Sequence, residues 1–209
     1  MSGNMIITIG RQFGSGGHEI GRRLAKAMGY DLYDKELLKM QAERSGIAEK
    51  VLESYDESPT NSLLYSIVMD VYPSMNYVGN SLNQQIYQAQ YDTIYSLRDK
   101  GHCVIIGRGA DYILRECPNL VSVFVCADLD DRAQRVAEYE NVTTAKARDM
   151  VLKADKKRAN FYNFQTENRW GQAESYDLCV NSSALGYDGA VELIQEFVEI
   201  KRRHIGYDK

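Results

Sequence analysis

The chain has 209 residues, a formal net charge of −4 at pH 7 and a pI near 5.5, and 44% of its residues are hydrophobic. This size predicts one domain with a real core, and the acidic balance gives no general attraction to nucleic acid. The first residues lack the basic and apolar runs of an export signal, and no later run is long enough to cross a bilayer. We therefore expect a cytoplasmic protein with neither a nucleic-acid nor a membrane partner.

The usage of cysteine and histidine argues against a metal centre built from protein ligands. The four cysteines form no C-x-x-C pair, and the three histidines show no H-E-x-x-H pattern. Cys103, Cys126 and Cys179 lie in apolar segments, where each is expected to be a small buried hydrophobic residue. The sequence predicts no metal bound by side chains alone.

The segment from residue 5 to residue 28 has the pattern of a phosphate-binding loop. Residues 5–9 are an apolar run that predicts a buried strand, and glycines 14, 16 and 17 permit a tight turn with accessible backbone N–H groups. From Gly17 onward, Ile20, Leu24 and Met28 recur at helical spacing. A helix beginning there directs the positive end of its dipole at the loop, which favours an anion.

This loop departs from the standard pattern G-x-x-x-x-G-K-[ST]. Gly17 stands where the lysine is expected, His18 stands where the hydroxyl residue is expected, and Arg11 replaces the first glycine. A dinucleotide pattern, G-x-G-x-x-G, fails at Glu19. A glycine-rich turn without a ligand is the alternative interpretation.

Three further apolar segments predict strands: residues 103–107, 121–127 and 176–180. Helical patterns separate them, so we expect an α/β fold with a mainly parallel sheet and helices on both faces. In such sheets ligands bind at the carboxyl ends of the strands.

Residues 33–100 are too many for a simple crossover and predict a helical insert. Pro59 and Pro73 divide it, and helices are expected over about 35–45 and 81–100. Tyr87, Tyr91 and Tyr95 recur every fourth residue and therefore share one helix face. A packed face or a homodimer interface is favoured over stacking on a nucleobase.

The basic segment 145–169 predicts a long helix. Arg148, Asp155 and Arg158 fall on one side of it. A solvated face with local ion pairs is the alternative to a functional role.

Taken in order, these features resemble the cytidylate kinase family of nucleoside monophosphate kinases, and most closely its divergent cytidylate kinase-like branch. The resemblance rests on the loop GRQFGSGGHEIG, Gly107-Arg108-Gly109, the D-K-K-R element at 155–158 and the segment YDLCVNS at 176–182. It implies a single domain over residues 1–209 with a P-loop kinase fold. A helical acceptor-binding insert at about 34–100 and an arginine-bearing lid at about 138–172 are also implied.

The resemblance further implies a role for each matched residue. The donor triphosphate of ATP, with Mg²⁺, is expected at Gly14, Ser15, Gly16, Gly17 and His18. The acceptor, CMP or dCMP, is expected at Asp34, Arg108, Asp155 and Arg158, although Gly109 stands where the family has aspartate. Arg132 and Arg135 are expected to approach the transferring phosphoryl group.

Phosphoryl transfer depends on alignment and positive charge, and a phosphate acceptor is already an anion at neutral pH. Because Gly17 leaves the loop without its lysine, we expect Arg11, His18 or Arg22 to supply that charge, with Arg11 first because it lies in the loop. Val151 stands where many cytidylate kinases carry another arginine, which leaves the acceptor open. A kinase of another small metabolite and a nucleotide-binding regulatory protein without catalysis are the alternatives.

Overall fold

The structure, a computed structural model, describes residues 4–34, 36–47 and 76–205. In this part of the chain five parallel strands form one sheet in the order β2-β3-β1-β4-β5. The strands are β1 (Ile6–Arg11), β2 (Asp31–Tyr33), β3 (Cys103–Ile106), β4 (Leu120–Cys126) and β5 (Leu178–Asn181). The predicted α/β class and parallel sheet are confirmed.

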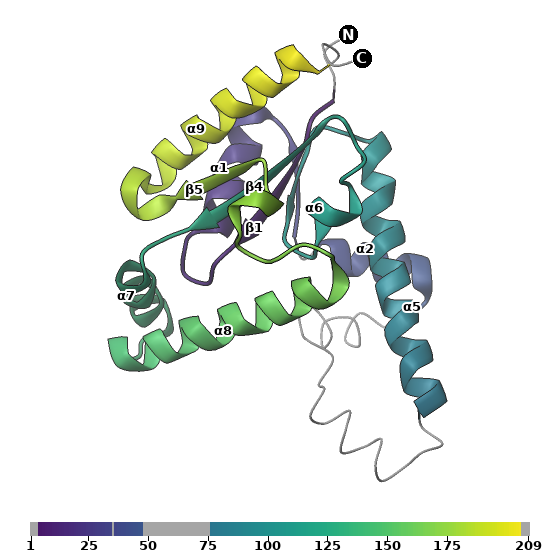
Figure 1. The fold of residues 1–209 in the computed structure, drawn as a ribbon, viewed down its shortest axis with the longest axis horizontal. Coiled ribbons are helices and arrows are strands. Elements are labelled where there is room, and N and C mark those ends of the chain that lie inside the picture. The colour runs from purple at the N-terminus through teal and green to yellow at the C-terminus, as the bar shows by residue number, and fades with distance from the viewer. Residues whose placement is uncertain (1–3, 35, 48–75, 206–209) are drawn as a thin grey trace.

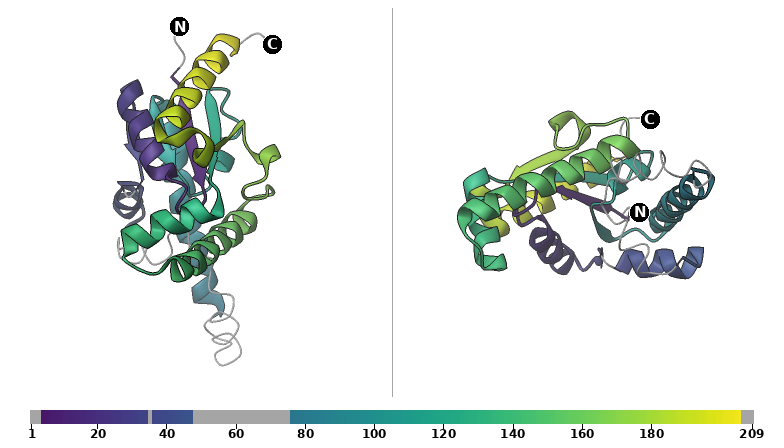
Figure 2. Two further views of the ribbon diagram at one scale, coloured as in Figure 1. Left: turned by 90° about the vertical axis from the view of Figure 1, so that its left-hand side faces the viewer. Right: turned by 90° about the horizontal axis from the view of Figure 1, so that it is seen from below.

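Helices cover both faces of the sheet (Figures 1 and 2). They are α1 (Gly17–Met28), α2 (Glu36–Ser45), α5 (Asn76–Tyr95), α6 (Ala110–Ile113), α7 (Leu129–Glu140), α8 (Thr144–Gln165) and α9 (Ser182–His204), with short 3-10 turns η2 (Ser96–Asp99) and η3 (Ala173–Ser175). A non-helical residue, Gly186, interrupts the first turns of α9.

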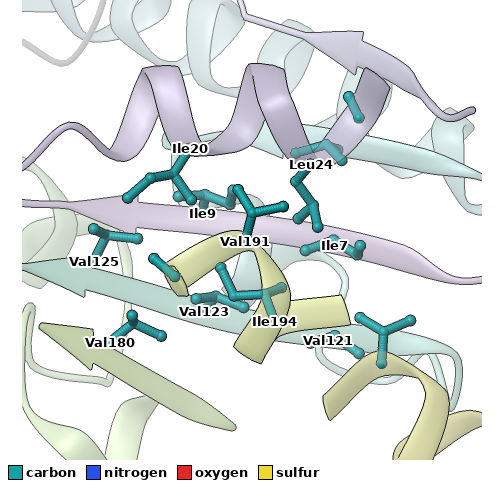
Figure 3. Packing of buried hydrophobic residues seen from close by; sticks show 14 of the residues in the cluster. Ile7, Ile9, Ile20, Leu24, Val121, Val123, Val125, Val180, Val191 and Ile194 are labelled. Atoms are coloured by element: carbon teal, nitrogen blue, oxygen red, sulfur yellow. The ribbon is translucent and has the colours of Figure 1, made fainter. Parts of the chain in front are cut away.

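One face of the sheet packs against α1 and α9. Alternate residues of β1 and β4, such as Ile7, Ile9 and Val123, meet Leu24 of α1 and Ile194 of α9, as Figure 3 shows. All five side chains are fully buried. Buried apolar side chains recur every second residue in the strands and every three to four residues in the helices. This spacing places them on the facing sides of the two layers.

The opposite face packs against α2, α5 and α6. Ile6 and Ile105 point to this side and contact Leu37 of α2, Ile94 of α5 and Ala110 of α6. Because both faces are covered, the central strands are mainly apolar, with Thr8 and Ser122 as buried polar exceptions.

The carboxyl ends of the strands point toward α7 and α8, and α8 runs across that end of the sheet (Figures 1 and 2). The chain leaves β1 toward β2 on one side, whereas it crosses from β3 over β1 to reach β4 on the other. A crevice forms beyond the strands where the connections diverge in this way, and it is the usual ligand position in open parallel sheets.

The predicted strand segments are confirmed with small shifts in their ends, and one strand was missed. The three residues of β2 are too few for a periodic pattern, and they are held by pairing with β3. The expectation that Cys179 is buried is wrong, because it lies on the exposed side of the edge strand β5. Cys103 is buried and Cys126 is intermediate.

Both helices predicted in the insert are present, with α5 beginning earlier than expected. The rings of Tyr91 and Tyr95 stack with centroids 5.6 Å apart, as a shared helix face requires. Pro59 and Pro73 lie outside the described residues. The long helix predicted from residue 145 is α8, which ends at Gln165.

Candidate active site

The glycine loop between β1 and α1 adopts a conformation that larger residues would not accept. Gly14 and Gly16 have φ angles of 77° and 78°, in the left-handed region. A Cβ on Gly14 would lie 2.8 Å from the carbonyl oxygen of Arg132, and one on Gly16 would overlap the ring of Tyr187. The loop therefore packs closely on α7 and α9, and the first amides of α1 face it.

Gly17, the third glycine of the loop, is required for a different reason. A Cβ on Gly17 would lie 2.5 Å from Cβ and 3.0 Å from Cγ of Arg11. The stem of the Arg11 side chain thus occupies the space that a lysine at position 17 would need. Arg11 and Gly17 are complementary in shape.

Hydrogen bonds hold the loop from within and from α9. The Ser15 hydroxyl is buried and donates to the carbonyl oxygen of Gln12 over 2.9 Å, and the Gln12 side chain accepts from the N–H of Ala127. The Ser182 hydroxyl donates to the carbonyl oxygen of Ser15 over 2.7 Å. The loop is therefore rigidly supported before any ligand binds.

A buried ion pair ties α7 and α8 to the loop. Arg132 is 6% exposed and donates to Oδ2 of Asp155 over 2.5 Å and to the carbonyl oxygen of Ala127 over 3.0 Å. Oδ1 of Asp155 accepts from the N–H of Phe13 over 2.7 Å. One carboxylate of α8 thus joins the loop backbone to the arginine of α7.

Two further arginines bond to the loop backbone. Arg135 donates to the carbonyl oxygen of Gly14 and to the hydroxyl of Ser182, both over 3.3 Å. Arg158 donates to the carbonyl oxygen of Arg11 over 3.1 Å. These contacts concentrate positive charge around the loop, where an anion is favoured.

A second cluster connects the loop to the start of the insert. Nε2 of His18 lies 3.2 Å from Oδ2 of Asp34. Arg108, which is 3% exposed, donates to the backbone carbonyl of Asp34, and its guanidinium lies 3.7 Å from the Asp34 carboxylate. Gln90 of α5 donates to the carbonyl oxygen of Arg108 over 2.8 Å and holds that residue at a φ of 59°.

A cavity of about 20 Å³ lies between these groups, at the carboxyl ends of β1 and β3. Its lining combines arginines, glycines and aromatic residues: Gly10, Arg11, Gly107, Arg108, Gly109, Asp111, Arg158, Phe161, Tyr162, Trp170 and Tyr176. Three of the arginines expected to bind substrates therefore face one space.

The cavity also contains a buried carboxyl that the motifs did not indicate. Asp111 is 8% exposed and accepts a hydrogen bond of 2.5 Å from the hydroxyl of Tyr162. Burial raises the pKa of Asp111 to about 6, and the bond from Tyr162 opposes that rise. Burial first, and then the nearby Asp111 carboxyl, raise the pKa of Tyr162.

The structure brings together the residues singled out from the motifs, in two linked groups. Arg132, Arg135 and Asp155 contact the loop, whereas His18, Asp34 and Arg108 form the cluster at the insert. Arg22, one candidate for the missing charge, donates instead to Glu19. Sequence reasoning missed Gln12, Asp111, Tyr162, Tyr176 and Tyr187. Only Gln12 and Tyr176 lay in quoted motifs, and only the fold shows what they face.

The part of the chain that the structure describes contains no group of three or more His, Cys, Asp or Glu side chains suited to a metal ion. Among the same residues, no helix has the length and apolar character needed to span a membrane.

The parallel sheet, the glycine loop and the arginines around it define a P-loop kinase fold. Shikimate kinase from Bacteroides thetaiotaomicron has a similar structure, with 15% identity, a TM-score of 0.51 and coverage of 93% of this chain and 98% of that one. TT1252 from Thermus thermophilus has 15% identity, a TM-score of 0.53 and coverage of 94% and 97%. At this level of identity the likeness concerns the fold alone.

Residues 6–184 match the cytidylate kinase-like family, and the chain belongs to that family. The crystal structure of an uncharacterized protein from Eubacterium ventriosum ATCC 27560 is 30% identical, with a TM-score of 0.70 and coverage of 93% of this chain and 98% of that one. None of the curated proteins with which the chain was compared matches it. The family and the fold together identify this protein as a kinase.

Proposed function

We propose that the protein transfers the γ-phosphate of ATP to a nucleoside monophosphate, with CMP or dCMP as the acceptor. The observation that carries the proposal is the cavity beside the glycine loop, which Arg11, Arg108 and Arg158 line together. A donor triphosphate on the loop and an acceptor phosphate at these arginines would be neighbours. Such alignment supplies much of the rate enhancement in phosphoryl transfer.

On the donor side, the triphosphate binds the backbone from Gly14 to His18 at the start of α1. Helix N-termini attract anions through free amides and the helix dipole. Arg11 takes the part of the absent lysine, because its side chain lies against Gly17. An arginine can hold phosphate oxygens through two parallel donors. Replacing the loop lysine by Arg11 therefore keeps the positive charge and adds a defined direction to the contact.

On the acceptor side, Arg108 and Arg158 hold the acceptor phosphate. Asp34 positions Arg108 through its carbonyl and carboxylate, and Asp155 positions Arg132 beside the loop. The attacking phosphate oxygen is already ionised, so no strong base is needed. Arg132 and Arg135 stabilise the charge that develops on the transferring group.

Mg²⁺ enters this proposal together with ATP. The only hydroxyl between Gly14 and His18, that of Ser15, is buried and bonded to Gln12, and His18 replaces the usual hydroxyl residue. Magnesium keeps several waters and often takes its remaining ligands from substrate phosphates. These residues fit an ion held mainly by the triphosphate, where it neutralises phosphate charge.

A coupled ADP-release assay with MgATP tests the proposal. The panel is CMP, dCMP, UMP, AMP and shikimate, and the acceptor-free rate is the background. We expect the greatest stimulation with CMP or dCMP. Release with shikimate alone would indicate a kinase of another metabolite, and no release above background with any acceptor would favour a nucleotide-binding regulatory protein.

The proposal includes a cytoplasmic location and a homodimer. The stacked pair Tyr91 and Tyr95, the latter 38% exposed, supports an interface on α5. Sedimentation of the purified chain and fractionation of the producing cells test these two points.

A further inference from the structure

His18 stands where the standard phosphate loop carries a hydroxyl residue that helps to hold the metal ion. Ser15, the only hydroxyl residue between Gly14 and His18, is buried and donates to the carbonyl oxygen of Gln12. The group that the loop presents at this place is therefore an imidazole. The His18 side chain is 57% exposed, so a ligand on the loop can reach it.

The carboxylate of Asp34, directly after β2, faces this imidazole. Nε2 of His18 lies 3.2 Å from Oδ2 of Asp34, whose side chain is 19% exposed. The other carboxylate oxygen, Oδ1, lies 3.7 Å from the guanidinium of Arg108. Each oxygen of Asp34 therefore has its own neighbour, and Oδ2 is the one directed at His18.

The separation of these two atoms suits two ligands of one ion. Adjacent ligands of an octahedral ion with bonds of about 2.1 Å lie about 3.0 Å apart. Among the described residues no third His, Cys, Asp or Glu joins the pair to complete a metal site, so phosphate oxygens and water would fill the other positions. A direct hydrogen bond between His18 and Asp34 is the alternative.

We propose that His18 and Asp34 bind the divalent ion that accompanies ATP, and that they select a first-row transition ion such as Mn²⁺ or Co²⁺ over Mg²⁺. Magnesium is held almost entirely by oxygen ligands, whereas an imidazole nitrogen suits transition ions. Replacing the usual hydroxyl by an imidazole therefore changes which ion the site prefers. This inference rests on the proposed function, which supplies the triphosphate on the loop.

Pulsed electron paramagnetic resonance on the full chain with Mn²⁺ and ATP tests the proposal without relying on turnover, because an imidazole nitrogen bound to Mn²⁺ modulates the electron spin echo. His18→Ser restores the hydroxyl of the standard loop, and Asp34→Asn removes the charge of the second ligand. His204→Ser, at an exposed histidine at the end of α9, is the matched control. We expect the nitrogen modulation in every protein except His18→Ser.

Titration calorimetry compares the affinity for ATP in the presence of Mn²⁺, Co²⁺ or Mg²⁺. Wild type should bind ATP at least about tenfold more tightly with Mn²⁺ or Co²⁺ than with Mg²⁺, a size typical of contacts that support metal binding. His18→Ser should lose this preference, and Asp34→Asn should bind ATP more weakly with all three ions. ATP with a chelator and no metal should bind equally to wild type and His18→Ser.

Absence of the nitrogen modulation in wild type, or its persistence in His18→Ser, overturns the proposal, as does equal affinity of wild type for ATP with all three ions. Weaker binding of metal-free ATP to His18→Ser would also overturn it, because that result assigns His18 to the triphosphate and not to the ion.

The outcomes separate this inference from the proposed function. If the modulation is found but no acceptor releases ADP, the proposed function fails and this metal site stands. If CMP stimulates ADP release and the modulation is absent, the proposed function stands and this metal site fails.

Discussion

At the residue scale, Arg11 explains why Gly17 stands where the standard loop has a lysine. A Cβ on Gly17 would collide with Cβ and Cγ of Arg11, so the loop accommodates a side chain at residue 11 or one at residue 17, but not both. The departure from the usual loop pattern is thus two coupled substitutions. The positive charge stays near the loop but comes from the end of β1.

This coupling predicts the behaviour of a double variant. Arg11→Ala should lower turnover about 10²- to 10³-fold, the usual loss when one transition-state donor is removed. Gly17→Lys alone should also lower turnover, because the lysine and Arg11 compete for one space. The double variant Arg11→Gly/Gly17→Lys, which also removes the Cβ at position 11, should recover at least about tenfold over Arg11→Ala.

Steady-state ADP release measures all three variants, and Arg203→Ala, an exposed arginine at the end of α9, is the control. Wild-type turnover in Arg11→Ala would contradict the assignment of Arg11. A double variant no better than Arg11→Ala would show that the two positions are not interchangeable.

At the element scale, α8 connects the loop to α7. Asp155 is the point of contact, because it accepts from both the Phe13 backbone and the buried Arg132. Val151, one turn earlier, is fully buried against Val136 of α7, which explains why an arginine is absent there. One face of α8 therefore serves the core and the site together.

Removing the carboxylate of Asp155 should destabilise the folded state. We expect Asp155→Ala to lower the free energy of unfolding by about 3 kcal/mol, because Arg132 would remain buried without its partner. Asp149→Ala removes the same group from an exposed pair with Lys153 on the same helix, and it should change stability by less than about 0.5 kcal/mol. Urea unfolding of both variants measures the difference, and similar losses in the two would contradict the assignment.

At the scale of the whole molecule, the buried carboxyl of Asp111 makes stability depend on pH. Burial raises its pKa from 3.8 to about 6 in the folded chain. The folded state therefore holds this proton more tightly than the unfolded state. Its contribution to stability is complete below about pH 4 and is lost as the pH rises through 6.

Asp111→Asn removes this titration. The variant should gain stability relative to wild type between pH 4 and pH 8, by up to about 3 kcal/mol at 1.36 kcal/mol per pKa unit. Urea unfolding of both proteins at the two pH values measures the change, and taking the difference between pH values removes any constant effect of the substitution. A difference in the free energy of unfolding between variant and wild type that is equal at both pH values would contradict the raised pKa of Asp111.

Much of the fold was predictable because it depends on local patterns. Strands β1, β3 and β4 are mainly apolar, and α1 follows glycines with a clear helical period, so short-range sequence specifies them. In contrast, β2 has three residues and exists through its pairing with β3. Cys179 has the same apolar neighbours as a buried cysteine, and only its place on an edge strand exposes it.

For this protein, sequence by itself determined the α/β class, the glycine loop at the start of α1 and the arginines that surround it, because the order of motifs carries that information. Only the tertiary structure decided that Arg11 occupies the space beside Gly17 and that Asp111, Tyr162 and Tyr176 share a cavity. These residues come from segments far apart in the chain. Their proximity is set by the packing of α6 and α8 at the carboxyl ends of the strands, which no local pattern encodes.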